Sequence, residues 1–188
     1  MPSALDVITD WPVSAAAAAV VGPSGVLGVH GDQKRVFRLA SVTKPLVARA
    51  AAIAVEEGVL DLDTPSGPPG ATVRHLLAHA SGLSMQSADV QARPGTRRIY
   101  SNYGFQVLAE TIEAQSGIEF SRYLAEAVFE PLGMTSARLE GGAAVAGFDL
   151  VQCVRRVLGG GPEHADLQGD AFVLQAVFSD GLSNISLF

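Results

Sequence analysis

The sequence predicts an α+β fold, an antiparallel sheet accompanied by helices, and three observations lead to this prediction. The chain has 188 residues, and because a domain averages about 150 residues we expect one. Residues 16–39 hold short apolar runs separated by turn residues, which is typical of strands. After Val42 the apolar residues recur at helical spacing. Strands therefore come first and helices follow.

Two strands of an antiparallel hairpin are predicted near the N-terminus. The apolar runs over 16–21 and 26–29 flank the turn sequence GPSG at 22–25. A third short strand is expected over 36–39, where apolar and polar residues alternate. These strands are too few to complete a sheet.

Helices are predicted over most of the remaining chain. The longest runs from Val42 to Val55 and ends near Gly58, because Leu46, Ala50 and Ala54 lie on one face. Further helices are expected over 72–79, through Phe105, Leu108 and Ile112 as far as Gly117, and over 120–129, where Pro131 ends the last one.

Composition and charge exclude several classes of protein. Hydrophobic residues make up 48% of the chain and charged residues 17%, which argues against a disordered protein. The net charge is −6, and the 13 lysines and arginines are scattered. Because nucleic acids and anionic membranes are bound by basic patches, we expect neither as a partner.

The single cysteine and the apolar run near the start of the chain bear on the compartment. Cys153 has no second cysteine to pair with, and a free thiol fits a reducing compartment. The run over 13–21 follows Asp6 and Asp10 rather than basic residues, and it is shorter than the roughly 20 residues that span a bilayer. We expect a cytoplasmic protein with no signal peptide or membrane segment; the oligomeric state stays open.

Ser41 and Lys44 form the first candidate catalytic pair. Residues three apart are neighbours on a helix, and Ser41 stands where a strand gives way to a helix. Its backbone amide and the positive end of the helix could meet an oxyanion that forms on an attacked carbonyl. A nearby lysine can activate a serine as a nucleophile. The alternative is an ordinary helix start with a solvated lysine.

Tyr100 and Asn102 form the second candidate cluster. A phenol has a pKa near 10 in water, but neighbouring ammonium groups favour the phenolate, which can act as a general base. The Asn102 amide could donate to a substrate carbonyl and also bind a lysine. The alternative is that Tyr100 packs on a loop and Asn102 caps the next helix.

Two further pairs of residues have side chains that could form a site, and we expect neither to do so. His75 and His79 are four residues apart on one predicted helix, a spacing that two metal ligands could use, but no third ligand is evident, so we expect no metal. Asp61 and Asp63 alternate with leucines and are interpreted as part of a loop, because paired catalytic carboxylates need burial.

Three ordered segments carry a family resemblance: FRLASVTKP over 37–45, LLAHASGL over 76–83 and YSNYG over 100–104. With GVLDLD at 58–63 and EPLGM at 130–134, they resemble the class C-type serine β-lactamase and penicillin-binding-protein-like family. The resemblance implies the serine β-lactamase/DD-peptidase-like fold. It also implies acyl transfer, with no cofactor, on small molecules: β-lactams, D-amino-acid peptides or small esters.

The resemblance also implies a role for each matching residue. Ser41 would be the acylated nucleophile and Lys44 its activating partner. Tyr100 would be the base for acylation and deacylation, and Asn102 would contact the substrate. His79 belongs to what resembles a structural signature of the family, and we therefore place it outside catalysis.

The chain departs from the family pattern in its C-terminal half. The family's third motif, a His- or Lys-Thr/Ser-Gly triplet on an edge strand, does not occur there. We therefore expect a partial serine hydrolase domain over 1–147 and a divergent or frameshifted tail over 148–188, so that the fold is incomplete at the C-terminus. Two hypotheses follow: a serine acyl hydrolase, or a non-catalytic or weakly active remnant of one. A metallohydrolase that uses the two histidines is a distant third.

Overall fold

The computed structural model describes residues 4–22, 25–146, 174–177 and 184–187. The chain divides into two compact units. One comprises residues 1–43 and 129–188, and the other comprises residues 44–128. No helix in the described ranges is long and apolar enough to cross a membrane.

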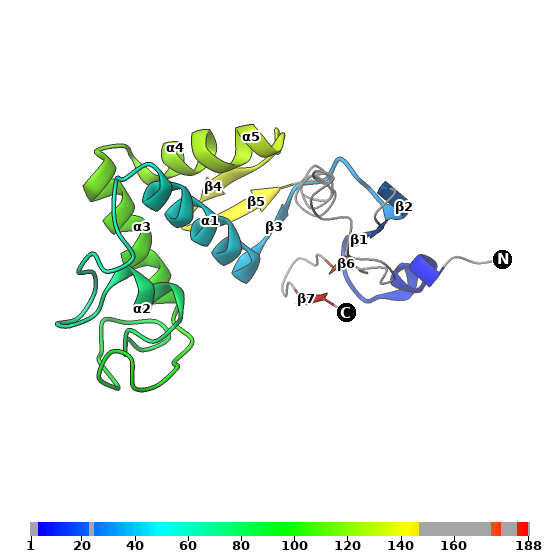
Figure 1. The fold of residues 1–188 in the computed structure, drawn as a ribbon. Helices are drawn as coiled ribbons and strands as arrows, with labels where there is room; N and C mark the ends of the chain where they lie inside the picture. The colour runs from blue at the N-terminus through cyan, green and yellow to red at the C-terminus, as the bar shows by residue number, and fades with distance from the viewer. Residues whose placement is uncertain (1–3, 23–24, 147–173, 178–183, 188) are drawn as a thin grey trace. The chain divides into compact units, whose positions relative to one another are not determined.

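The first unit contains the β-strands (Figure 1). After the 3-10 helix Ala4–Asp10, β1 (Ala17–Gly22) and β2 (Gly25–Gly31) pair as an antiparallel hairpin. This confirms the predicted hairpin. The predicted third strand is the shorter β3 (Phe37–Arg38).

This unit also contains a three-stranded antiparallel sheet with the order β3-β5-β4. The strands β4 (Arg138–Glu140) and β5 (Ala143–Ala146) were not predicted. They are joined by Gly141 and Gly142, which have φ of 55° and 79°, as the tight two-residue turns of hairpins require. The Gly-Gly pair in the sequence could therefore have been used to predict this hairpin.

Two C-terminal strands, β6 (Leu174–Val177) and β7 (Asn184–Leu187), also pair in antiparallel fashion. Both strands fall in the tail predicted over 148–188, most of which lies outside the described residues.

The second unit is helical (Figure 1). It is made up of α1 (Thr43–Glu56, whose first residue belongs to the other unit), α2 (Val73–Leu77), α3 (Asn102–Ser116) and α4 (Phe120–Leu124). Ala50, Ala51 and Ala54 of α1 are fully buried, and such small side chains let neighbouring elements approach closely. Leu108 and Ile112 of α3 are buried too, as the apolar spacing predicts.

Two predicted helix ends differ from the structure. The segment after α4 continues as a π-helix over Ala125–Phe129 and then as α5 (Glu130–Leu132), so Pro131 does not stop it. Proline is tolerated there because it lies in the first turn of α5, where its missing N–H is not needed. Helix α2 ends at Leu77, two residues before His79, and this changes the interpretation of the two histidines.

Candidate active site

Ser41 lies in a strained turn at the start of α1. The residue before it, Ala40, has φ of 44°, a left-handed conformation that costs a non-glycine residue roughly 1–2 kcal/mol. The 3-10 turn Ala40–Val42 passes directly into α1, and the Val42 N–H donates to the Leu39 carbonyl at 2.9 Å. Ser41 itself is exposed.

Ala144 of β5 fixes both ends of this turn. The Leu39 N–H donates to the Ala144 carbonyl at 2.8 Å, and the Ala144 N–H donates to the Thr43 hydroxyl at 2.9 Å. Leu39 and Ala144 are fully buried. Because buried hydrogen bonds on both sides of Ser41 hold the backbone, the strained conformation of Ala40 persists.

Lys44 brings together two distant parts of the sequence within the second unit. Its Nζ donates to Asn102 Oδ1, 58 positions away in the chain, at 2.6 Å. The same Nζ lies 4.6 Å from the centroid of the Tyr100 ring and 5.9 Å from that of Phe105. Lysine only donates hydrogen bonds, so it is the amide oxygen of Asn102 that faces it. The structure thus unites three of the four predicted site residues: Lys44, Tyr100 and Asn102.

Ser101, rather than Asn102, caps helix α3. The Ser101 hydroxyl accepts from the Gly104 N–H at 2.8 Å and donates to the Ser84 carbonyl at 2.6 Å. Ser101 is 1% exposed. Asn102 is the first residue of the helix, and its N–H donates to the Met85 carbonyl at 2.8 Å. The alternative in which Asn102 serves as the cap is wrong, and its side chain instead contacts Lys44.

His79 holds the segment that carries Tyr100. Its carbonyl accepts from the Ile99 N–H at 2.8 Å, and its ring Nδ1 accepts from the Ser101 N–H at 3.1 Å. The ring lies 4.6 Å from the Tyr100 ring, tilted by 35°, and 5.0 Å from the Phe105 ring. His79 is buried and has φ of 57°.

Burial and charge keep the His79 ring neutral. Burial lowers the pKa of His79 most, and the positive charges of Lys44 and Arg98 lower that pKa further. A neutral ring agrees with the hydrogen bonding, because a backbone N–H can only donate and Nδ1 must therefore carry a lone pair. The ring proton then resides on Nε2.

A family model described as Beta-lactamase matches residues 11–147. The chain belongs to the β-lactamase family. This confirms the resemblance stated from the sequence and, with it, the fold class.

Solved and curated relatives agree with this membership. The crystal structure of a β-lactamase from Mycobacterium bovis is 55% identical with a TM-score of 0.80, and the match covers 94% of this chain and 74% of that one. Penicillin-binding protein 4* of Bacillus subtilis is 29% identical over 55% of this chain, and esterase EstB of Burkholderia gladioli is 29% identical over 52%. The matches span only 30% and 37% of these two curated proteins.

The prediction that His75 and His79 lie on one helix is wrong for this member of the β-lactamase family. Helix α2 ends at Leu77, and the left-handed conformation of His79 takes it off the helical path. His75 Nδ1 is hydrogen-bonded to the Thr72 hydroxyl at 3.0 Å, while His79 Nδ1 accepts from Ser101. No group of three or more possible metal ligands occurs in the described parts of the chain.

The sequence interpretation gave Ser101 no role of its own and placed His79 only in a structural signature of the family. A serine directly before an apolar helical pattern is a common N-cap signal, so the cap could have been predicted. The hydrogen bond between His79 and Ser101 left no local signal, because the two residues are 22 positions apart in the chain.

Proposed function

We propose that this chain is a serine acyl hydrolase that acts through an acyl-enzyme intermediate. Ser41 is the nucleophile, Lys44 its activating partner, Tyr100 the base and Asn102 the residue that contacts the substrate. The observation that carries the proposal is the position of the Lys44 ammonium group, 2.6 Å from Asn102 Oδ1 and 4.6 Å from the Tyr100 ring. Family membership supports the same assignment.

The proposed reaction needs one proton acceptor and two additions to a carbonyl. Ser41 Oγ attacks the carbonyl carbon while its proton passes to the Tyr100 phenolate. The leaving group then departs with that proton, which leaves an ester on Ser41. Water attacks this ester while Tyr100 accepts a proton from it. Tyr100 then passes that proton to Ser41 Oγ as the ester bond breaks, which releases the acid product and restores the Ser41 hydroxyl. No cofactor takes part in these steps.

Lys44 and Asn102 have different roles in this proposal: Lys44 acts on Tyr100, and Asn102 acts on the substrate. The positive charge of Lys44 beside the Tyr100 ring favours the phenolate over the phenol. Because the oxygen of Asn102 faces Lys44, its NH₂ group is the part that can donate to the carbonyl of a bound substrate. The strained turn at Ala40 presents the Ser41 hydroxyl at the beginning of α1, where helix polarity favours a forming oxyanion.

Three substrate classes fit this chemistry: β-lactams, D-amino-acid peptides and small esters. Each offers an activated or exposed carbonyl carbon to a serine. The similar proteins are named as a β-lactamase, a penicillin-binding protein and an esterase, and these names correspond to the same range. We propose a small-molecule substrate from one of these classes.

Turnover of three probes tests the proposal: nitrocefin, p-nitrophenyl acetate and a D-alanyl-D-alanine peptide. We expect at least one to be hydrolysed by the wild type and by Ser116→Ala, a control at the far end of α3, but not by Ser41→Ala. Equal turnover by the Ser41→Ala variant would overturn the assignment. Hydrolysis of none of the three would favour the other hypothesis, a weakly active remnant, which stays a prediction.

A further inference from the structure

We propose that His79 is a positioning residue for the catalytic segment Tyr100–Asn102, and that only its neutral ring can do this work, so that one proton on Nδ1 releases the segment. This inference rests on the proposed function, because it assumes that Tyr100 and Asn102 act on the substrate. Its consequence is a site that loses activity in acid for a reason separate from the ionisation of the base.

The hydrogen bonds of His79 lie on both sides of Tyr100. The His79 carbonyl accepts from the N–H of Ile99 at 2.8 Å, and the ring Nδ1 accepts from the N–H of Ser101 at 3.1 Å. Between these two anchors the Tyr100 ring lies 4.6 Å from the imidazole. One residue therefore sets the backbone before and after Tyr100 and also contacts its side chain.

Two further backbone carbonyls hold the later part of the segment. Ser101 donates through its hydroxyl to the Ser84 carbonyl, and Asn102 donates through its N–H to the Met85 carbonyl. Neither bond reaches the backbone at Tyr100. Loss of the bond between His79 Nδ1 and the Ser101 N–H thus affects the position of Tyr100 more than the fold of α3.

The surroundings of His79 disfavour its protonated form. Burial disfavours the charged ring most, and the positive charges of Lys44 from α1 and Arg98 from the segment before Tyr100 add to this effect. Tyr100 is the titratable neighbour in ring contact, while α3 contributes the uncharged Phe105. An imidazolium would place two protons on the ring, and its Nδ1–H would point at the N–H of Ser101. Two donors cannot bond to each other, so protonation breaks the contact.

The variant His79→Asn separates the hydrogen bond from the titration. Asparagine tolerates the left-handed conformation of His79 better than most residues. Its Oδ1 is attached to Cγ as Nδ1 is in histidine, so it can accept from the Ser101 N–H, and it does not ionise. The matched control is His75→Asn, because His75 lies in the same unit and bonds to Thr72, away from the site.

The first test is the ratio of kcat/KM for His79→Asn to that for the wild type, measured with p-nitrophenyl acetate across pH. The ratio cancels any ionisation that both proteins share. We expect it to be constant above about pH 7 and to rise about tenfold for each pH unit below the pKa of His79. The corresponding ratio for His75→Asn should stay flat. A flat ratio for His79→Asn would overturn the proposal.

The second test needs no activity, and so separates this proposal from the proposed function. In wild-type protein followed by NMR, the backbone amide resonance of Ser101 should shift with the same midpoint as the ring resonances of His79. If the Ser101 amide does not respond while His79 titrates, His79 does not hold this segment through Nδ1. If the amide responds but none of the probes is hydrolysed by the wild type, the positioning role stands and the proposed function fails. This measurement also decides the matter if His79→Asn does not fold.

Discussion

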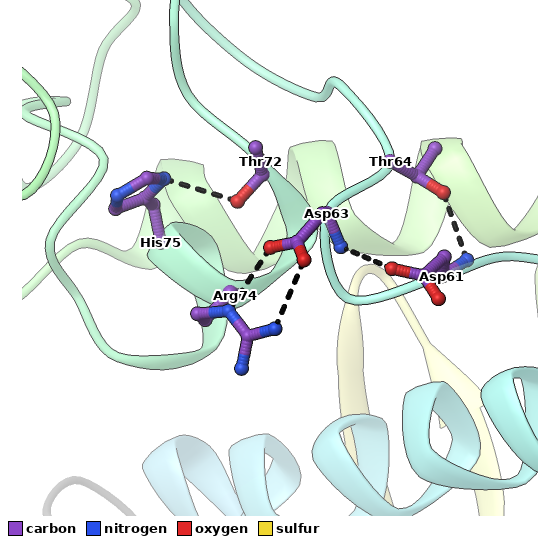
Figure 2. A network of polar contacts seen from close by, with 6 residues as sticks. All are labelled: Asp61, Asp63, Thr64, Thr72, Arg74 and His75. Atoms are coloured by element: carbon purple, nitrogen blue, oxygen red, sulfur yellow. Dashed lines mark hydrogen bonds and ion pairs between the residues drawn. The ribbon is translucent and has the colours of Figure 1, made fainter.

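Two polar networks in the second unit both contain a histidine, but one is based on an exposed ion pair and the other on buried hydrogen bonds. The loop network, shown in Figure 2, is made of Asp61, Asp63, Thr64, Thr72, Arg74 and His75. Its main contact is the ion pair in which Arg74 Nε and Nη2 donate to the two carboxylate oxygens of Asp63 at 3.1 and 3.2 Å. The side chains of Arg74 and Asp63 are 55% and 70% exposed.

The site network is made of Lys44, His79, Tyr100, Ser101 and Asn102. The ammonium group of Lys44 donates to the amide oxygen of Asn102 and lies over the ring of Tyr100. The imidazole of His79 accepts a hydrogen bond from the backbone N–H of Ser101. His79 and Ser101 are buried, at 8% and 1% exposure. Exposed ion pairs contribute little to stability, whereas buried polar groups are costly when they lose a partner.

The loop network contributes to the fold, whereas the site network contains the residues that we propose for the chemistry. In the loop network, the hydrogen bond and charge of Arg74 lower the pKa of Asp63, so each charge favours the ionised form of the other. In the site network, burial lowers the pKa of His79 most, and the positive charges of Lys44 and Arg98 lower it further. In the loop network the positive charge of Arg74 is paired with the carboxylate of Asp63. In the site network the positive charge of Lys44 lies beside Tyr100 and Asn102, which we propose to act on the substrate.

The largest expected effect is that of Lys44→Met. This change removes the ammonium group that contacts both Tyr100 and Asn102, and because such a group acts as a unit with the nucleophile, turnover should fall by about 10³-fold or more. The control is Arg74→Met in the loop network, which should leave turnover within about twofold, since it breaks only an exposed ion pair. Rates with p-nitrophenyl acetate decide between them. Equal losses in the two variants would abolish the distinction between the networks.

Tyr100→Phe should have the next largest effect. Only a hydroxyl is removed, so the fold should persist, while turnover should drop by roughly 10²-fold, the usual contribution of a general base. The matched control is Tyr103→Phe, at the second position of α3, for which we expect wild-type turnover. Unchanged rates in Tyr100→Phe would remove Tyr100 from the proposed mechanism.

The sequence predicted those parts of the second unit in which neighbouring residues decide the structure. The buried face of α1 at Ala50 and Ala54 follows from apolar spacing. The end of α3 at Gly117, which has φ of 70°, follows from the conformational freedom of glycine. Residue chemistry predicted that the Asn102 amide could bind a lysine, and the structure identifies that lysine as Lys44.

The remainder depends on contacts between distant residues. The spacing of His75 and His79 suggested one helix, but the left-handed conformation of His79 takes it off that helix. Its ring Nδ1 instead accepts a hydrogen bond from the Ser101 N–H. The turn at Ser41 is likewise held by Ala144, a partner of Thr43 that lies 101 positions further along the chain. Local patterns carry no information about such partners.

A smaller effect is expected when the two N-cap positions are compared. Ser101→Ala removes the cap of α3 and also leaves the buried carbonyl of Ser84 without this donor, so the free energy of unfolding should fall by about 2 kcal/mol or more. Thr72 stands at the N-cap of α2 without a side-chain cap bond and contacts His75. Thr72→Ala should therefore cost about 1 kcal/mol or less. Urea denaturation would compare the two, and equal losses would argue against the special role of Ser101.

The smallest effect concerns stability in acid. The pKa of His79 is lower in the folded protein than its usual value, so as pH falls below about 6.5 the unfolded chain takes up this proton first. The free energy of unfolding should therefore decrease as pH falls through this range. The decrease should be smaller in His79→Asn, which has no ring to protonate. Melting temperatures of the wild type and this variant at a series of pH values would show the difference, and identical pH dependence in the two proteins would contradict the assigned direction.

We propose that Lys44 activates Ser41 as the nucleophile, and the location of a covalent adduct tests this proposal. The full chain would be treated with a fluorophosphonate probe and with a penicillin, digested, and mapped by mass spectrometry. We predict one adduct, on the peptide that contains Ser41, and no adduct in Lys44→Met. An adduct on another serine while Ser41 stays unmodified, or labelling of Lys44→Met at the wild-type rate, would contradict the account.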